Sequence, residues 1–266
     1  LSSTPKYNLI YDAFGWERPN YIHLPPVMRD AEHKLSKRYN DPGYHDLIEE
    51  GFLKEALINY IALLGWNPKN NQEKMSFEEL KSLFSLEGLS KSPAIFDKQK
   101  LLWLNGEYIK EMSEEDFHSY AMPYYKKSKL KDYDFTKISR LLHTRIEAFS
   151  QIPRKIDFLE EFRRFDVSLY NRDKLKTNID IAKKVLPQAA RNLAEIDLWD
   201  IENINNALAE AAQQRKLKKG QVMWCVRIAL TGQEVTPGGS AEMAEILGKQ
   251  RALKRLNNSM EWLNNN

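Results

Sequence analysis

The chain of 266 residues has a single cysteine, Cys225, and five histidines. One cysteine cannot form a disulfide within the chain or a cysteine-cluster metal site. The histidines show neither an HExxH motif nor another ligand spacing, so we expect no metal site. These absences favour a reducing, cytoplasmic setting.

Long apolar runs are also missing. The longest, "EALINYIALLGW" (residues 55–66), is interrupted by Asn59 and Tyr60 and is too short to span a bilayer. The N-terminal "LSSTPKYN" lacks the basic, apolar and small-residue regions of a signal peptide. We therefore expect no membrane partner. The first residue is not Met, which suggests a cut end rather than a natural start.

Charge of both signs is plentiful, but it is unevenly distributed. Residues 1–125 hold 14 Lys and Arg against 19 Asp and Glu, whereas residues 126–266 hold 26 against 18. A basic half of this kind is a candidate surface for a polyanion such as nucleic acid. Many helical domains are basic without binding nucleic acid, so the asymmetry alone leaves the partner open.

From residue 43 onward, apolar residues recur at helical spacing and no sustained two-residue alternation occurs. Start signals agree with helices: an S-x-x-E capping box begins at Ser76, and Asp97 and Ser113 are further candidate caps. A lysine-rich turn before Gly220 predicts the end of an alanine-rich helix. The chain is therefore predicted to be mostly α after a short α/β segment.

A polar stretch without periodicity, "KKSKLKDYDF" (residues 126–135), is the main predicted domain boundary. We expect three domains, formed by residues 1–42, 43–128 and 129–266. The third could divide again near residues 180–187.

A short basic stretch, "HKLSKR" (residues 33–38), is the candidate for phosphate chemistry. Lys34 and Lys37 lie three positions apart, with the hydroxyl of Ser36 between them. A lysine is a movable point charge that can follow a phosphate group through a reaction. Positive charge beside a developing pyrophosphate stabilises the transition state. Taken alone, the stretch could equally be an exposed basic turn.

The segments around this stretch resemble the glutamyl-tRNA synthetase family in order and spacing. The resemblance lies in "STPKYNLIYDAFGWERPNYIHLPPV", "DLIEEGFLKEALINYIALLGWNP" and "EGLSKSPAIFDKQKLLWLNGEYI". The last part, "GQVMWCVRIALTGQEVTPGG" with "EILGKQRALKRL", is similar to the stretch that closes the bacterial members. The resemblance covers essentially the whole chain. It identifies residues 34–38, the lysine loop, as the KMSKS-type signature of class I aminoacyl-tRNA synthetases.

The resemblance implies that Lys37 meets the ATP phosphates as the catalytic lysine and that Lys34 assists it. The ATP loop is completed by Leu35, Ser36 and Arg38. The sequence departs from the family pattern in two ways: "RDAEH" replaces the usual Asp-Gly turn before the loop, and Tyr39 stands where histidine is frequent. Neither departure removes a charged group from the loop.

The HIGH signature and the "R-G-x-x-H" stretch of the family are not found in the sequence. The resemblance therefore implies a C-terminal piece of a bacterial member with a mostly α fold. A short α/β remnant of the catalytic domain (1–42) would precede a helical stem-contact domain (43–128) and an all-helical anticodon-binding region (129–266). ATP with Mg is expected in the full-length parent. We expect no cofactor bound to the chain and no aminoacylation by the chain alone.

The family's C-terminal helices bind the anticodon arm of tRNA, which requires cationic backbone contacts and stacking on the bases. "RLLHTRIEAFSQIP" is similar to a family block and makes Arg145 the first RNA-binding candidate. The other candidates, from "LYNRDKLKTN" and "VRIALTG", are Tyr170, Arg172, Lys174, Lys176, Arg227 and Thr231. A surface ion pair is the alternative role for each arginine, and a structural contact between helices is a further one for Arg227.

The implied partner is tRNA-Glu, either alone or together with tRNA-Gln, with no DNA and no membrane, and the chain is expected to be a monomer. The alternative function is a stand-alone helical RNA- or protein-binding module with no ligase role. Glutaminyl relatives are disfavoured because their anticodon region consists of β-barrels, and no strand pattern occurs here. The queuosine-modifying paralogues lack an anticodon region.

Overall fold

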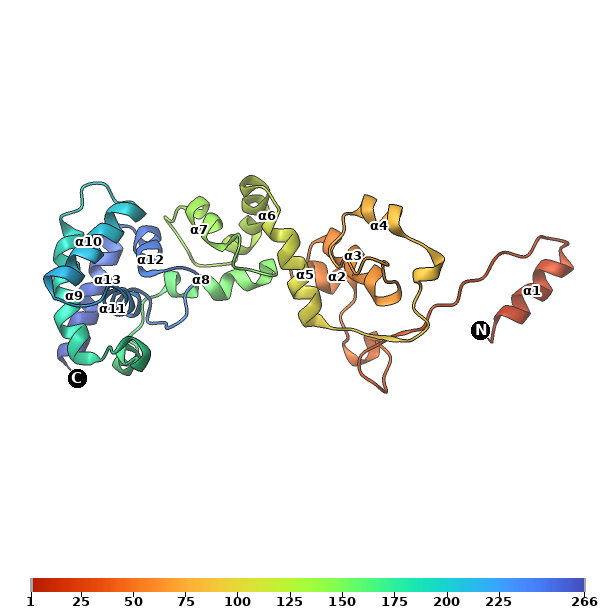
Figure 1. The fold of residues 1–266 in the computed structure, drawn as a ribbon, viewed down its shortest axis with the longest axis horizontal. Coiled ribbons are helices and arrows are strands. Elements are labelled where there is room, and N and C mark those ends of the chain that lie inside the picture. Colours follow the sequence, from red (N-terminus) through yellow and green to blue (C-terminus); the bar gives the residue numbers. More distant parts are fainter. Residues whose placement is uncertain (1, 266) are drawn as a thin grey trace. The chain divides into compact units, whose positions relative to one another are not determined.

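The computed structural model describes residues 2–265, which form two compact units. One unit extends to Tyr108 and the other begins at Ile109. Thirteen α-helices, several short 3₁₀ turns and a two-stranded parallel sheet make up the regular structure of these residues (Figure 1). The prediction of a mostly α fold is confirmed.

The first unit combines the small sheet with the first helices of the chain. Its helices are α1 (Thr4–Ala13), α2 (Tyr44–Glu49), α3 (Lys54–Gly65), α4 (Phe77–Leu83) and α5 (Lys98–Lys110). Its strands are β1 (Val27–Met28) and β2 (Ala94–Ile95). Val27 lies opposite Ala94 and Met28 lies opposite Ile95, so the sheet joins the segment before the lysine loop to the segment before α5.

Buried polar side chains connect α3 to its neighbours in this unit. The side-chain oxygen of Asn59 accepts hydrogen bonds from the backbone N–H of Met75 (2.9 Å) and the hydroxyl of Tyr108 (2.9 Å). The hydroxyl of Tyr60 donates to the carbonyl of Asp97 (3.0 Å). Buried polar groups need such partners, because an unpaired one costs about 1–3 kcal/mol. These bonds therefore hold α3 and α5 beside the sheet from which the lysine loop extends.

The second unit is all-helical within the described residues. Its further helices are α6 (Glu114–Lys126), α7 (Phe135–Leu142), α8 (Ile152–Glu160), α9 (Ile179–Ala194), α10 (Ile201–Gln214), α11 (Lys219–Thr231), α12 (Ser240–Leu247) and α13 (Lys249–Asn264). The polar stretch at residues 126–135 connects α6 to α7, which pack against each other. Residues 180–187 lie within α9. The division after residue 128 remains a prediction.

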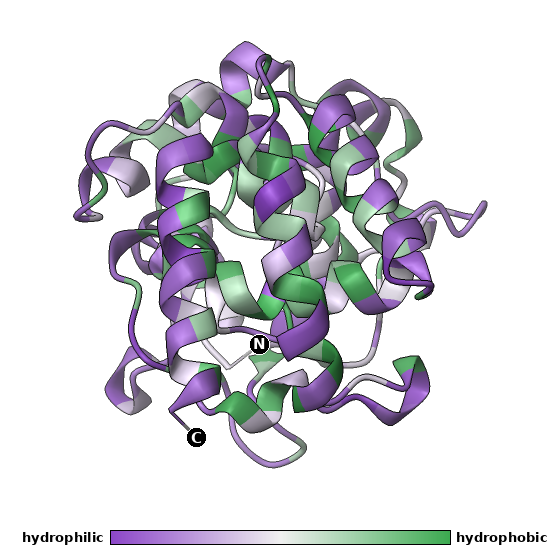
Figure 2. Ribbon diagram, turned by 90° about the vertical axis from the view of Figure 1, so that its left-hand side faces the viewer, coloured by the Kyte–Doolittle hydropathy of each residue, from purple (hydrophilic) through white to green (hydrophobic). Residues whose placement is uncertain are grey.

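Helix α11 is the most buried helix of the second unit, with nine of its thirteen residues buried. A helix that is apolar on all sides needs other helices around it. Helices α9, α10, α12 and α13 pack against α11. Figure 2 shows the resulting pattern, with hydrophilic residues on the outer faces of the helices and hydrophobic residues toward the interior.

The helix caps predicted at Ser76, Asp97 and Ser113 are confirmed. The hydroxyl of Ser76 accepts from the backbone N–H of Glu79 (3.2 Å), and the Glu79 carboxylate accepts from the N–H of Ser76 (2.8 Å), which completes the capping box of α4. Asp97 caps α5 through the N–H of Gln99 (2.9 Å). Ser113 caps α6 in the same manner.

The predicted helix end at Gly220 is wrong. Helix α10 ends at Gln214, and Lys216 adopts the left-handed backbone conformation (φ 54°) after it. Gly220 instead lies in the first turn of α11, where the Gln221 side chain accepts from the N–H of Lys218 (3.0 Å). A left-handed lysine costs roughly 1–2 kcal/mol, and we attribute its presence to the packing of α10 against α11.

Candidate functional site

The lysine loop is attached to strand β1 by backbone contacts. The N–H of Leu35 donates to the carbonyl of Val27 (3.1 Å). Met28 and Lys34 form an isolated antiparallel bridge. Because β1 is also paired with β2, the start of the loop has a fixed position within the first unit.

The second half of the lysine loop is a short 3₁₀ turn formed by Lys37–Tyr39. Ser36 begins this turn, and its hydroxyl accepts from the N–H of Arg38 (3.3 Å). The N–H of Ser36 donates to the carboxylate of Asp41 (2.8 Å). Ser36 therefore has a local structural role, which the sequence did not indicate.

The turn before the lysine loop is organised by Asp30. One of its carboxylate oxygens accepts from the N–H groups of Glu32 (2.9 Å) and His33 (2.8 Å) and contacts the His33 ring (2.8 Å). The N–H of Glu32, then that of His33, and then the His33 ring hold the pKa of the Asp30 carboxyl well below its usual range. The "RDAEH" departure from the family pattern thus still forms a tight turn, in which the aspartate side chain binds the backbone.

The three cationic side chains of the lysine loop are Lys34, Lys37 and Arg38. All three are exposed, and none has a side-chain hydrogen bond or ion pair within residues 2–265. The neighbouring Arg29, in contrast, lies 5.1 Å from the ring of Tyr39 and contacts Asp30 (3.4 Å). The loop therefore presents unneutralised positive charge, which an anionic ligand such as a phosphate would neutralise.

The second unit contains an open cleft of about 1070 Å³ that includes Arg145, and we call it the Arg145 groove. Its charged lining residues are the cations Lys110, Arg145, Arg154 and Lys155 and the carboxylates of Glu147, Asp157 and Glu234. Arg145 donates to the carbonyl of Leu141 (2.6 Å) and to the Glu242 carboxylate (3.2 Å). The side chain remains 39% exposed, so these contacts orient the guanidinium at the surface of the groove.

Two further predicted arginines meet the Arg145 groove at Glu234. Arg172 donates to the Glu234 carboxylate (3.3 Å) and lies over the ring of Trp224, 4.7 Å from its centroid. Arg227 donates to the backbone carbonyl of Glu234 (3.3 Å). The structure thus brings together three arginines that are far apart in the sequence. The surface ion pair considered as an alternative role is present for Arg145 and Arg172.

Lys174 and Lys176 lie on the turn that follows Arg172. The turn includes a 3₁₀ segment (Asp173–Leu175) and is closed by an antiparallel bridge between Arg172 and Thr177. Both lysines are exposed, and neither ammonium group has a partner within the described residues. They remain candidates for contacts with an RNA backbone.

Tyr170 and Thr231, in contrast, are core residues. Tyr170 is fully buried, packs 5.9 Å from Phe165 between ring centroids, and has a hydroxyl without a hydrogen bond of normal geometry. Burial raises the pKa of the Tyr170 hydroxyl far above its ordinary value. Thr231 is buried and donates to the carbonyl of Arg227 within α11 (2.8 Å). Because neither exposes enough surface to touch RNA, we remove both from the candidate interface.

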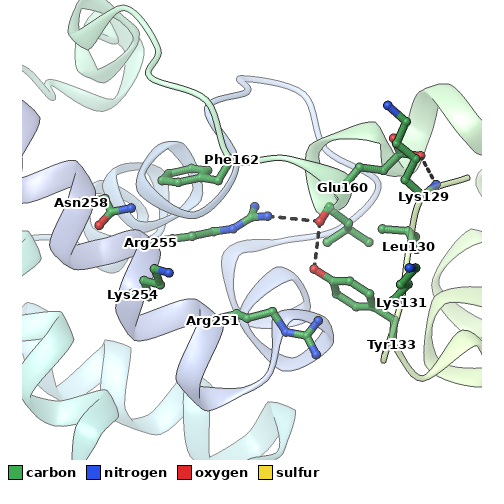
Figure 3. A pocket seen from close by; sticks show the side chains of 11 residues that line it. Lys129, Leu130, Lys131, Tyr133, Glu160, Phe162, Arg251, Lys254, Arg255 and Asn258 are labelled. Atoms are coloured by element: carbon green, nitrogen blue, oxygen red, sulfur yellow. Dashed lines mark hydrogen bonds between the residues drawn. The ribbon is translucent and has the colours of Figure 1, made fainter.

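A second, smaller cleft of about 440 Å³ in this unit was not identified from the sequence (Figure 3). We call it the basic cleft. Its lining residues come from positions 129–133, 159–162 and 251–258. The closely spaced cations in "KKSKLKDYDF" and "GKQRALKRL" were a signal, but nothing in the sequence indicated that the two segments meet.

Two families of known domains match the chain in succession. Residues 1–103 match the catalytic domain of class I tRNA synthetases (E and Q), and residues 116–260 match an anticodon binding domain. This succession is that of a class I aminoacyl-tRNA synthetase whose catalytic domain is followed by a tRNA-binding region.

Individual relatives agree with these matches. Glutamate–tRNA ligase of Clostridium tetani is 49% identical over 265 residues, which cover 100% of this chain and 54% of the relative. The corresponding ligase of Clostridium kluyveri is 49% identical over 256 residues, or 96% of this chain and 53% of the relative. A crystal structure of a glutamate tRNA ligase from Elizabethkingia meningosepticum, in complex with its amino acid, superposes with a TM-score of 0.81. It is 26% identical and covers 98% of this chain and 55% of that one.

The chain therefore belongs to the glutamate–tRNA ligase family and corresponds to the C-terminal part of its bacterial members. It spans about half the length of the curated relatives it matches. A stand-alone helical module unrelated to a ligase is not favoured by these matches.

Proposed function

We propose that the chain is the tRNA-binding C-terminal part of an enzyme that uses ATP to attach glutamate to tRNA. The observation that carries this proposal is the Arg145 groove in a chain of the glutamate–tRNA ligase family: Arg145 and Glu234 line it, and Arg172 and Arg227 both donate to Glu234. Guanidinium groups bind phosphates with two parallel hydrogen bonds and stack on bases, so this cluster suits the unpaired nucleotides of an anticodon loop.

The lysine loop suits a second anion, the phosphates of ATP with its Mg ion. Lys34, Lys37 and Arg38 are exposed and have no partners within residues 2–265, as a phosphate site requires. Lys37 would stabilise the charge that develops on the leaving pyrophosphate when glutamate is activated. Leu35 and Ser36 would hold the loop in shape through their backbone N–H groups, which donate to the Val27 carbonyl and to the Asp41 carboxylate.

The remaining roles follow from the same proposal. Residues 43–128 would contact the tRNA stem and residues 129–266 the anticodon arm, with Lys174 and Lys176 on the RNA backbone. The tRNA bound is tRNA-Glu, either alone or with tRNA-Gln. We propose a cytoplasmic monomer that binds neither DNA nor a membrane. None of the helices described is both long and apolar enough to cross a membrane.

The test is the salt dependence of binding between this chain and three RNAs: tRNA-Glu, tRNA-Gln and an unrelated tRNA. We expect binding of tRNA-Glu that weakens linearly on a logarithmic salt scale as counterions are released. Charge reversal at Arg145 and Lys174 (Arg145→Glu, Lys174→Glu) should weaken binding. It should also reduce the slope by roughly 1 for each phosphate that the variant no longer neutralises.

The matched control reverses two exposed lysines of α9 that line neither the Arg145 groove nor the basic cleft, Lys183→Glu with Lys184→Glu. Thermal unfolding checks that each variant is folded. A salt slope that is the same for the Arg145 variant and the wild type would count against the proposed interface.

A further inference from the structure

The basic cleft concentrates positive charge more strongly than the Arg145 groove does. Its lining includes five cations and one carboxylate, Glu160, whereas four cations and three carboxylates line the Arg145 groove. The five cations are Lys129, Lys131, Arg251, Lys254 and Arg255. In Figure 3 these side chains surround the cleft from helix α13 on one side and from the segment before α7 on the other.

Arg255 is a buried cation without a carboxylate partner in the described structure. It is only 6% exposed, and it donates to the carbonyls of Leu230 (2.7 Å) and Leu159 (3.4 Å) near the ends of α11 and α8. Burial lowers the pKa of Arg255 to about 10, so the side chain is still charged at neutral pH. Carbonyls at helix C-termini compensate a cation only in part, because buried charges are ordinarily paired with an opposite charge. An anion in the cleft would supply that charge.

The aromatic rings beside the cleft are already engaged by the arginines. Arg251 lies 4.1 Å from the centroid of the Tyr133 ring, and Arg255 lies 4.7 Å from that of Phe162. Phe162 also stacks on Trp262, with 5.2 Å between centroids. Because an arginine already lies over each of these rings, we infer that recognition in the cleft depends mainly on its positive charge.

The lysines of the cleft are available for a ligand. Lys129, Lys131 and Lys254 are exposed, and none of their ammonium groups has a partner within residues 2–265. The Glu160 carboxylate accepts from the backbone N–H of Lys129 (3.0 Å) rather than from an ammonium group. The adjacent Glu161 is paired with Arg163 (2.7 Å), although Lys129 also acts on it electrostatically.

We propose that the basic cleft binds a backbone phosphate of tRNA, separately from the Arg145 groove and without reading a base. The inference rests on the proposed tRNA-binding function and adds a second contact to it. A concentration of positive charge with a single carboxylate matches a phosphate, which positions an RNA but carries no sequence information. The cleft also lies within residues 116–260, the segment that matches an anticodon binding domain.

The experiment removes two unpaired lysines of the cleft, Lys131→Ala with Lys254→Ala, in the complete chain. The control is Lys183→Ala with Lys184→Ala, which makes the same change in net charge away from the cleft. Affinity for tRNA-Glu and for an unrelated tRNA is measured at several salt concentrations. We expect the cleft variant to lose roughly 1 from the salt slope, for the one phosphate that it no longer neutralises, equally for both RNAs. The control should retain the wild-type slope.

Each other outcome has a distinct meaning. If the wild type binds no tRNA at low salt, the proposed function fails together with this inference. If the wild type binds but the cleft variant keeps its slope, only the inference fails. A loss confined to tRNA-Glu would show base reading and overturn the sequence-independent contact.

Two anion probes test whether an anion other than RNA occupies the basic cleft. Inorganic pyrophosphate tests whether a free phosphate occupies the cleft, and a hexaglutamate peptide tests whether an acidic protein segment does. The proposal would be overturned if either probe bound the wild type and not the cleft variant while both proteins bound tRNA equally well. Thermal unfolding of the variant checks its fold, since both lysines are exposed and their loss should leave stability unchanged.

Discussion

Tyr170 and Arg172 are two positions apart in one basic segment, but their environments differ completely. Tyr170 ends a 3₁₀ turn (Val167–Tyr170) that packs against α9 and α11, and its ring is fully buried. Arg172 begins the bridged turn that follows, and its guanidinium lies over Trp224 at the surface. At the scale of single residues, the backbone turn between them decides which side chain can meet RNA.

The core assignment of Tyr170 gives the first prediction at this scale. Because the hydroxyl has no hydrogen bond of normal geometry, Tyr170→Phe should change the free energy of unfolding by less than about 1 kcal/mol. Tyr170→Ala should cost about 3–5 kcal/mol, the usual loss for a buried aromatic ring. Urea unfolding measures both values. Weaker tRNA binding by Tyr170→Phe at unchanged stability would return this residue to the interface.

At the scale of elements, the sequence predicts what is encoded within one turn of the chain. The caps at Ser76, Asp97 and Ser113 were predictable because each depends on a residue and the N–H groups two or three positions later. The end of α10 was not predictable in this way. The prediction relied on Gly220, but glycine only favours the left-handed backbone conformation that follows a helix, and here Lys216 adopts that conformation. The basic cleft was not predictable either, because it is formed by three segments whose proximity depends on tertiary packing.

The lysine loop lies between these cases. Its sequence indicated phosphate chemistry, and its cations are unpaired in the described structure, but its anchoring depends on distant residues. Strand β1 pairs with β2, more than sixty residues later, and Asp41 binds the N–H of Ser36. The resemblance to a known family identified the loop, whereas only the structure explains how it is held.

Lys37 provides the prediction at the scale of this element. In a full-length parent enzyme, Lys37→Ala should slow glutamate-dependent ATP–pyrophosphate exchange by about 100-fold or more, because it removes charge stabilisation specific to the transition state. The matched control is Lys69→Ala, an exposed lysine of the same unit outside the loop. Unchanged exchange in the Lys37 variant would exclude this lysine from the activation step.

At the scale of the whole molecule, burial perturbs several titratable groups of the second unit. It raises the pKa of Cys225 to about 12, from an ordinary value near 9, and that of Tyr125 to about 12, from about 10. It also raises the pKa of Tyr170 and lowers that of Arg255 to about 10. These groups lie on α6, α11, α13 and the turn before α9, so they couple the stability of the unit to alkaline pH.

The sign of this coupling follows from which state holds the protons. For Cys225 and the two tyrosines, the folded state keeps a proton that the unfolded chain releases at lower pH. Their contribution is therefore complete well below pH 9 and is lost as the pH rises toward 12. Arg255 acts in the opposite direction near pH 10 and above, because the folded state favours its neutral form. Cys225 has the lowest ordinary pKa of these groups, so its share of the loss is largest between pH 9 and 10, where the tyrosines contribute less.

We therefore expect ionisation of the Cys225 thiol in the unfolded chain to lower the free energy of unfolding by about 1 kcal/mol between pH 9 and 10, and further above pH 10. In Cys225→Ala the stability near neutral pH should be lower because of the small cavity, but between pH 9 and 10 it should fall less steeply than that of the wild type, since only the tyrosines then contribute to the loss. Urea unfolding of both proteins across this interval measures the difference in slope, which does not depend on the constant loss from the cavity. Equal slopes would mean that the thiol ionises in the folded protein as easily as in the unfolded chain, contrary to its complete burial.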